Sequence, residues 1–84
     1  MNSIKIQKRD GKNIVGMITI PTLQGIDRHV YIFRKKVGNG LFYVSKEKMG
    51  ADAVFKDFKA MQRNYAALRA PGIDESLIYE GLDQ

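Results

Sequence analysis

The spacing of apolar residues changes once along this chain of 84 residues, close to residue 50. Before that point, short apolar and β-branched runs alternate with polar residues, which is typical of β-strands. After it, apolar residues recur at spacings of three and four, which is typical of one face of an α-helix. A chain this short supplies only one hydrophobic core. The pattern therefore predicts a single α+β domain over residues 1–84, with a sheet followed by a helix.

The first expected hairpin pairs residues 3–9 with residues 13–20 around Asp10-Gly11, which is a strong hairpin signal. A two-residue loop would divide the isoleucines of these strands between the two faces of the sheet. A three-residue loop, with Gly11 in the left-handed conformation, would place five isoleucines on one face: Ile4, Ile6, Ile14, Ile18 and Ile20. Because one face can then be buried as a whole, we expect the three-residue loop.

A second hairpin is expected over residues 27–36 and 41–45, joined by the glycine-rich turn at 38–40. Large apolar residues occupy both odd and even positions in the first of these segments: Val30 and Ile32, and Tyr31 and Phe33. Both faces of the sheet are therefore apolar in this region. The sequence leaves open which of the two faces the helix covers.

One long amphipathic helix is predicted over about residues 51–69, within a helical region at 50–70. Its apolar stripe consists of Ala51, Val54, Phe55, Phe58, Met61, Tyr65 and Leu68. Pro71 and Gly72 would end it, and Asp74 would cap a short helical turn in the tail at 71–84. The predicted architecture is a four-stranded antiparallel meander (residues 1–46), packed on one face by this helix and followed by a short C-terminal helical tail.

Positive charge is concentrated in the first part of the chain. The 14 basic and 9 acidic residues give a net charge of +5, and residues 1–48 alone carry +7. The tail has no cation and four acidic residues: Asp74, Glu75, Glu80 and Asp83. A basic surface attracts phosphate backbones and acidic protein surfaces. The acidic tail is able to lie against the basic part and mask it.

The sequence contains no pattern that is typical of an enzyme. It has no cysteine and a single histidine, His29, which excludes disulfides and a zinc site built from cysteine and histidine. The turn at 38–40 lacks the helix and the lysine of a phosphate-binding loop. The apolar runs are too short to span a membrane. We therefore expect a non-enzymatic, cytoplasmic protein that needs no cofactor or metal and has no membrane partner.

A binding surface is expected on the sheet face that the helix leaves uncovered. Aromatic rings among cations suit nucleic acid, because bases stack on the rings and phosphates pair with lysine and arginine. The candidate contact residues lie on the strands and their hairpins: Arg28, Tyr31, Phe33, Arg34, Lys35, Lys36, Tyr43, Lys46, Lys8, Arg9 and Lys12. Secondary phosphate contacts are expected on the outer face of the helix: Lys56, Lys59 and Arg63.

The same surface is compatible with two other functions. A protein-binding regulator or inhibitor, of the kind that phages and plasmids encode as accessory proteins, would use the aromatic and arginine side chains to bind an acidic protein surface. A symmetric homodimer would bury the uncovered face against itself. The sequence favours nucleic-acid binding, without distinguishing DNA from RNA.

Overall fold

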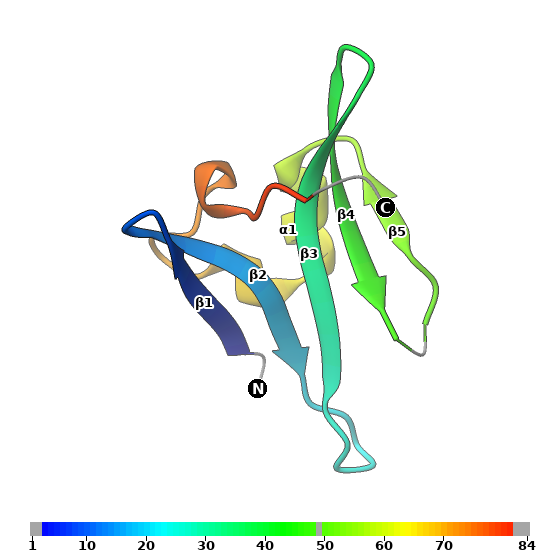
Figure 1. Ribbon diagram of the computed structural model, residues 1–84. Coiled ribbons are helices and arrows are strands. Elements are labelled where there is room, and N and C mark those ends of the chain that lie inside the picture. The colour runs from blue at the N-terminus through cyan, green and yellow to red at the C-terminus, as the bar shows by residue number, and fades with distance from the viewer. Residues whose placement is uncertain (1–2, 49, 82–84) are drawn as a thin grey trace.

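The computed structural model describes residues 3–48 and 50–81, which form one antiparallel sheet with a short helical cap (Figure 1). The sheet contains β1 (Ser3–Arg9), β2 (Lys12–Ile20), β3 (Arg28–Val37), β4 (Gly40–Glu47) and β5 (Ala53–Phe55), in this order. The helix α1 (Phe58–Asn64) and two 3₁₀ turns, η1 (Ala66–Arg69) and η2 (Glu75–Leu77), follow. The α+β class is confirmed, whereas the prediction of four strands and one long helix is wrong.

The first hairpin has a two-residue loop, not the predicted three-residue loop. Arg9 pairs with Lys12, and Asp10 and Gly11 between them have φ angles of 54° and 77°. Positive φ at both loop residues is typical of a type I′ turn, whose twist matches that of the two strands.

A β-bulge at Gly16 gives β2 one residue more than the paired part of β1. The β1–β2 register shifts between Lys5, which pairs with Met17, and Ile6, which pairs with Val15. This bulge reverses the alternation of side chains along β2. Of the five isoleucines predicted to share one face, four therefore do so, on the core face together with Val15: Ile4, Ile6, Ile18 and Ile20. The fifth, Ile14, pairs with Gln7 and lies on the opposite face.

The predicted helix over about 51–69 is replaced by three shorter elements. Residues 53–55 form β5, in which Val54 pairs with Val44 of β4 and is 65% exposed. The helix α1 begins only after Asp57, whose carboxylate accepts a hydrogen bond from the backbone N–H of Ala60 at 2.8 Å. This is an ordinary N-cap. The stripe predicted for a single helix therefore belongs to a strand, a helix and a 3₁₀ turn.

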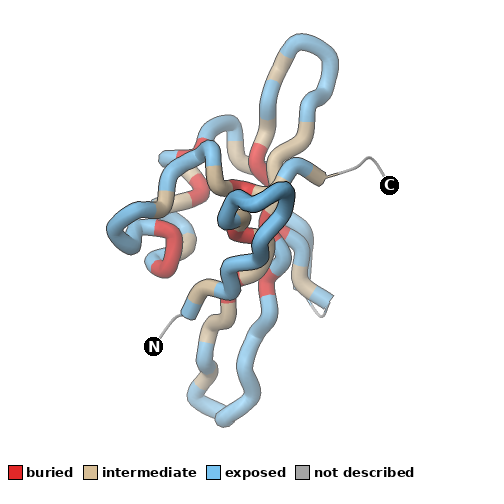
Figure 2. Tube along the Cα trace, turned by 60° about the vertical axis from the view of Figure 1, so that its left-hand side comes forward, coloured by how far each residue is buried: buried red, intermediate tan, exposed pale blue. Residues whose placement is uncertain are grey.

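The core lies between the sheet and the cap formed by α1 and η1. Its buried residues come from both layers: Val15, Ile18, Val30, Ile32, Tyr43, Phe58, Met61, Ala67, Leu68 and Ile78. Figure 2 shows these buried stretches gathered in the middle of the molecule, while the tips of the hairpins are exposed. The cap covers one face of the sheet only.

Residues 78–81 form an extended C-terminal segment between β2 and β3, where these strands separate. The backbone N–H of Tyr79 donates to the carbonyl oxygen of Val15 at 3.0 Å, and the carbonyl oxygen of Tyr79 accepts from the N–H of Arg34 at 2.7 Å. The N–H of Gly81 donates to the carbonyl oxygen of Arg34 at 3.0 Å. The segment thus satisfies backbone groups of both strands, and its first residue, Ile78, is only 2% exposed.

The tail was predicted to be helical, and it is helical only at η2. Asp74 caps this turn as predicted, because its carboxylate accepts a hydrogen bond from the backbone N–H of Ser76 at 2.8 Å. Pro71 and Gly72 form a turn before η2, and residues 78–81 after it form the extended segment. Asp83, the last predicted acidic residue of the tail, lies outside the described residues.

Replacing Ile78 tests whether the C-terminal segment belongs to the core. Ile78→Ala is expected to lower the free energy of unfolding by about 2–5 kcal/mol, because a buried side chain is lost and a cavity is left. Leu23→Ala, at a fully exposed loop position, should change it by less than about 0.5 kcal/mol. Urea denaturation measures both. Equal stabilities of the two variants would show that the segment does not pack as described.

Candidate functional site

The pairing of the strands decides which side chains point away from the cap. Directly paired residues point to the same face of an antiparallel sheet, and successive residues point to opposite faces. Val30 and Ile32 of β3 are buried in the core, so Tyr31 and Phe33 point to the other side. We call this side the open face. It faces the viewer in Figure 1, with α1 behind the sheet.

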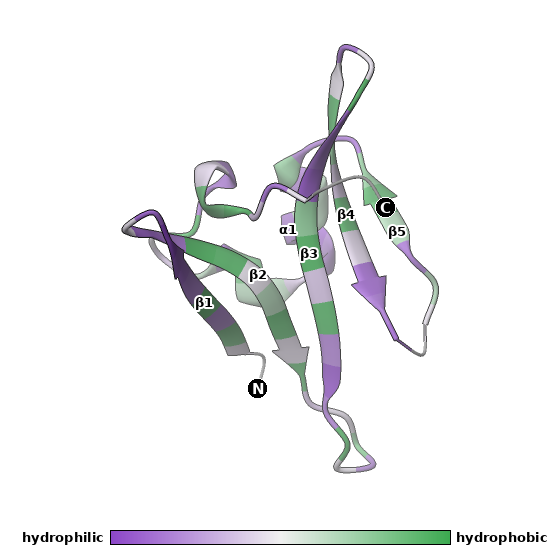
Figure 3. Ribbon diagram, in the orientation of Figure 1, coloured by the Kyte–Doolittle hydropathy of each residue, from purple (hydrophilic) through white to green (hydrophobic). Residues whose placement is uncertain are grey.

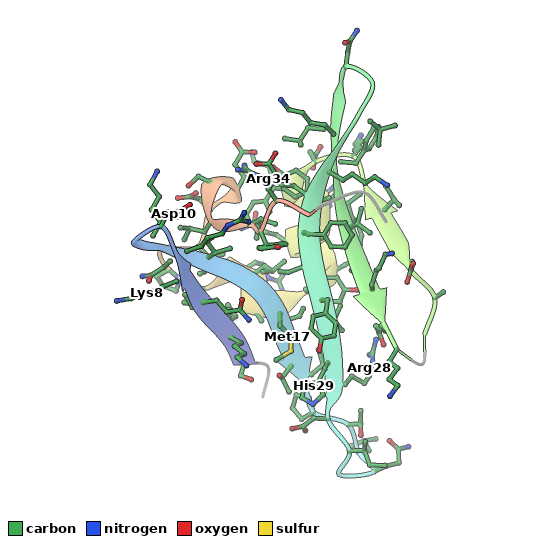
Figure 4. The ribbon with its side chains drawn as sticks, in the orientation of Figure 1. Lys8, Asp10, Met17, Arg28, His29 and Arg34 are labelled. Atoms are coloured by element: carbon green, nitrogen blue, oxygen red, sulfur yellow. The ribbon has the colours of Figure 1, made fainter. Side chains whose placement is uncertain are left out.

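A continuous row of four side chains crosses the open face. Lys5 pairs with Met17, Met17 pairs with Tyr31, and Tyr31 pairs with Lys46. Neighbouring strands are about 5 Å apart, so the row spans about 15 Å. Figure 4 shows Met17 in front of the sheet, next to β3. We call this set the lysine-flanked row, because it places Tyr31, which is 55% exposed, between two cations.

A groove of ≈ 780 Å³ lies on the open face, along β3 and β4. The strands supply Tyr31, Phe33, Lys35, Val37, Phe42, Val44, Lys46 and Val54, and neighbouring segments supply Asp52, Tyr79 and Gly81. Phe33 pairs with Val44, so the floor next to the lysine-flanked row is apolar. Figure 3 shows apolar and polar residues alternating along the middle of β3, with a polar end at the hairpin.

The C-terminal segment forms one wall of the groove and fits closely against its floor. A Cβ atom at Gly81 would lie 2.3 Å from the ring of Phe33, so only glycine is accommodated there without movement. The guanidinium of Arg9 lies 5.6 Å from the ring centroid of Tyr79, and the ammonium of Lys46 lies 5.9 Å from that of Phe33. These distances are typical of cation–π contacts. Cations and rings are therefore interleaved along the groove.

The open face is positively charged. Its cations include Lys5, Arg9, Lys35 and Lys46, and Lys12, which pairs with Arg9, lies on the same face at the end of the first hairpin. Among the described residues that line the groove, Asp52 is the one acidic residue, and its carboxylate lies 3.9 Å from the ammonium of Lys46. Both side chains of this pair are about half exposed, so water screens their attraction. Two lysines stand against one aspartate among the groove-lining residues that the structure describes.

Five of the predicted contact residues lie at or beside the groove: Tyr31, Phe33, Lys35, Lys46 and Arg9. The predicted set of contact residues does not include five residues of this region: Lys5, Met17, Phe42, Tyr79 and Gly81. The first three follow from strand register: the positions of Lys5 and Met17 depend on the bulge at Gly16, and that of Phe42 on the pairing of β3 with β4. The last two lie far from the sheet in sequence and are brought to it only by the tail, so no local pattern indicates them.

Three predicted contact residues lie instead on the side of the sheet that carries the cap. Tyr43 is 2% exposed, and its ring packs against that of Phe58 with 5.7 Å between centroids. A guanidinium nitrogen of Arg34 donates to the backbone carbonyl oxygen of Glu75 at 3.4 Å, and Figure 4 shows Arg34 beside the C-terminal segment. Arg28 forms an ion pair with Glu47. Their positions alternate with those of the open face, so these three side chains do not belong to it.

The other predicted cations are exposed and do not line the groove. Lys36 lies on β3 near the tip of the β3–β4 hairpin, while Lys8 and Lys12 lie on the first hairpin. Lys59 and Arg63 lie on α1, on the opposite side of the sheet from the groove, and Lys56 directly follows β5. These residues could contact phosphates only outside the groove.

Other kinds of site find little support among the described residues. Residues 3–48 and 50–81 contain no group of three or more side chains that could hold a metal ion. His29 lies on β3, with its Nδ1 atom 3.4 Å from the hydroxyl oxygen of Thr19. Within the same ranges, no helix is both long and apolar enough to cross a membrane.

Comparison with known proteins gives no relative. No protein-family model matches the sequence, and neither the curated proteins nor the solved structures compared with it contain a match. The function of the groove is therefore inferred from the residues that form it.

The hydroxyl of Tyr43 tests the packing beneath the sheet. Burial, together with the nearby carboxylate of Glu75, raises the pKa of Tyr43, whose hydroxyl donates to that carboxylate at 3.2 Å. Tyr43→Phe should destabilise the protein by about 1 kcal/mol at neutral pH, because the hydrogen bond is lost. A raised pKa in the folded state means that the stabilisation is present below the unfolded pKa of about 10 and is lost as the pH rises further.

Urea denaturation of both proteins at pH 8 and at pH values above 10 measures this contribution. The difference in stability between wild type and Tyr43→Phe should shrink as the pH rises. A difference that stays constant across the range would contradict the assigned environment of Tyr43.

Proposed function

We propose that this protein binds nucleic acid through the open face of its sheet. The observation that carries the proposal is the lysine-flanked row, in which the exposed ring of Tyr31 lies between the cations of Lys5 and Lys46. The adjoining groove adds further rings and Lys35. Bases stack favourably on such rings, and the surrounding cations neutralise phosphates.

The charge of the open face favours an anionic partner over a second copy of the chain. In a symmetric dimer, each patch meets its own copy, so the cations of one open face would approach those of the other. Like charges across an interface oppose association. With a polyanion the same cations are attractive, and the net charge of +5 adds to that attraction.

A protein partner is the second candidate, and the apolar rim of the face supports it. Val37 and Val54 line the groove and are 54% and 65% exposed, although phosphates gain nothing from aliphatic side chains. An acidic peptide with apolar residues would bury this rim. Affinity capture after nuclease treatment separates the candidates, because a protein partner is retained and a nucleic acid is lost.

Binding of a labelled oligonucleotide should weaken steeply with salt. If four cations neutralise phosphates of a single strand, log K should fall with log salt with a slope of about −3. Lys46→Gln should weaken binding and make the slope shallower by about 0.7, since one phosphate contact is lost. Fluorescence anisotropy between about 50 and 200 mM salt, the range over which phosphate contacts are progressively screened, measures both quantities.

Lys59→Gln is the matched control, because it removes the same charge from α1, on the opposite side of the sheet. It should leave affinity and slope nearly unchanged. Equal effects of the two variants would show that binding does not use the open face. Absence of binding at about 50 mM salt, where screening is weak, would refute the proposed function.

A further inference from the structure

We infer that the groove takes an unpaired strand, whose bases stack on a series of rings along β3 and β4, and does not take a duplex. This inference rests on the proposed function and specifies the class of nucleic acid. It follows from the spacing of the rings, the walls of the groove and the distribution of its charges.

The rings are spaced along the groove in steps. Tyr31 and Phe33 are alternate residues of β3, so their positions are about 7 Å apart along the strand. Phe42 lies diagonally across from Phe33, because Phe33 pairs with Val44 and Lys35 pairs with Phe42. Diagonal neighbours in a sheet are also about 7–8 Å apart. Three rings therefore lead from the lysine-flanked row towards the β3–β4 hairpin, as successive bases of a stretched strand require.

The walls of the groove restrict what can reach these rings. Tyr79 and Gly81 border it on the β3 side, and Asp52 and Val54 border it on the β5 side. A duplex is convex and keeps the faces of its bases stacked inside, so it would meet the rims of the groove only. Stacking duplex bases on the floor would first require unpairing them, at a cost of a few kcal/mol. An unpaired strand meets no such cost.

The charges are placed beside the rings and not on the floor between them. The apolar pair of Phe33 and Val44 offers a phosphate no partner, whereas Lys46 and Lys35 lie on the two sides of this pair along the strands. Arg9, over Tyr79, continues the positive charge along the wall formed by the C-terminal segment. Bases are therefore expected on the floor, with phosphates towards the lysines.

Three probes of equal phosphate number test the inference by fluorescence anisotropy with the full chain. They are a labelled single strand of about 12 thymidines, an abasic phosphodiester of the same length, and a hairpin duplex. The thymidine strand should bind about tenfold more tightly than either of the others, because only it can stack bases on the rings without unpairing. Shorter thymidine strands should bind more weakly, and the affinity should stop rising once the strand reaches about four nucleotides or more. The length at which it stops rising gives the size of the site.

Tyr31→Ala should weaken binding of the thymidine strand by about tenfold and leave binding of the abasic probe unchanged. Tyr31→Leu, which keeps an apolar side chain but removes the ring, should give the same loss. The exposed position of Tyr31 favours folding of both variants, and thermal melting checks it. Leu23→Ala is the control for an exposed apolar residue outside the groove and should have no effect.

The outcomes separate this inference from the proposed function. Equal affinity for the three probes, or an equal loss of abasic binding in Tyr31→Ala, would overturn the single-strand inference and leave nucleic-acid binding in place. Failure of all three probes to bind would overturn both. Binding of a labelled peptide of alternating glutamate and leucine, with no binding of any nucleic acid, would also overturn both and assign the groove to a protein.

Discussion

Burial of a single face of the sheet is the constraint on which the rest of this structure depends. The cap and Ile78 together cover Val15, Ile18, Val30 and Ile32, and this layer forms the core. Because side chains alternate along β3, Tyr31, between the core positions Val30 and Ile32, must point outwards. The exposed ring of Tyr31 and the groove beside it are thus a direct consequence of which residues the cap covers.

Much of this arrangement could be predicted from the local pattern. The alternating and helical periods indicated the α+β class, and the alternation of Val30 and Ile32 with Tyr31 and Phe33 indicated that both faces of the sheet are apolar there. Three features could not be predicted in this way. Residues 53–55 are too few for their period to distinguish a strand from a helix. The bulge at Gly16 and the docking of Tyr79 between β2 and β3 depend on contacts between segments that are distant in sequence.

The candidate site could be predicted only in part, because strand register is not visible in the local sequence pattern. Register decides which of two alternating sets of side chains faces the cap, and a shift of one residue exchanges the sets. Arg34 and Tyr43 were assigned to the binding surface without that information, and both lie on the covered side. Lys35, next to Arg34, and Lys46, three residues after Tyr43, point to the other face and do line the groove. Composition alone indicated a basic, aromatic sheet, whereas the pairing of strands selects the cations that can act together.

The most direct test of the account is to locate the surface that responds when an unpaired strand is added. Titrating oligothymidine into ¹⁵N-labelled protein and following the backbone amides by NMR gives this location. The largest shifts are predicted for residues of the open face: Met17, Tyr31, Phe33, Lys35 and Lys46. Only small shifts are predicted for Lys59 and Arg63 on α1. Shifts concentrated on α1, with the open face unchanged, would contradict the account.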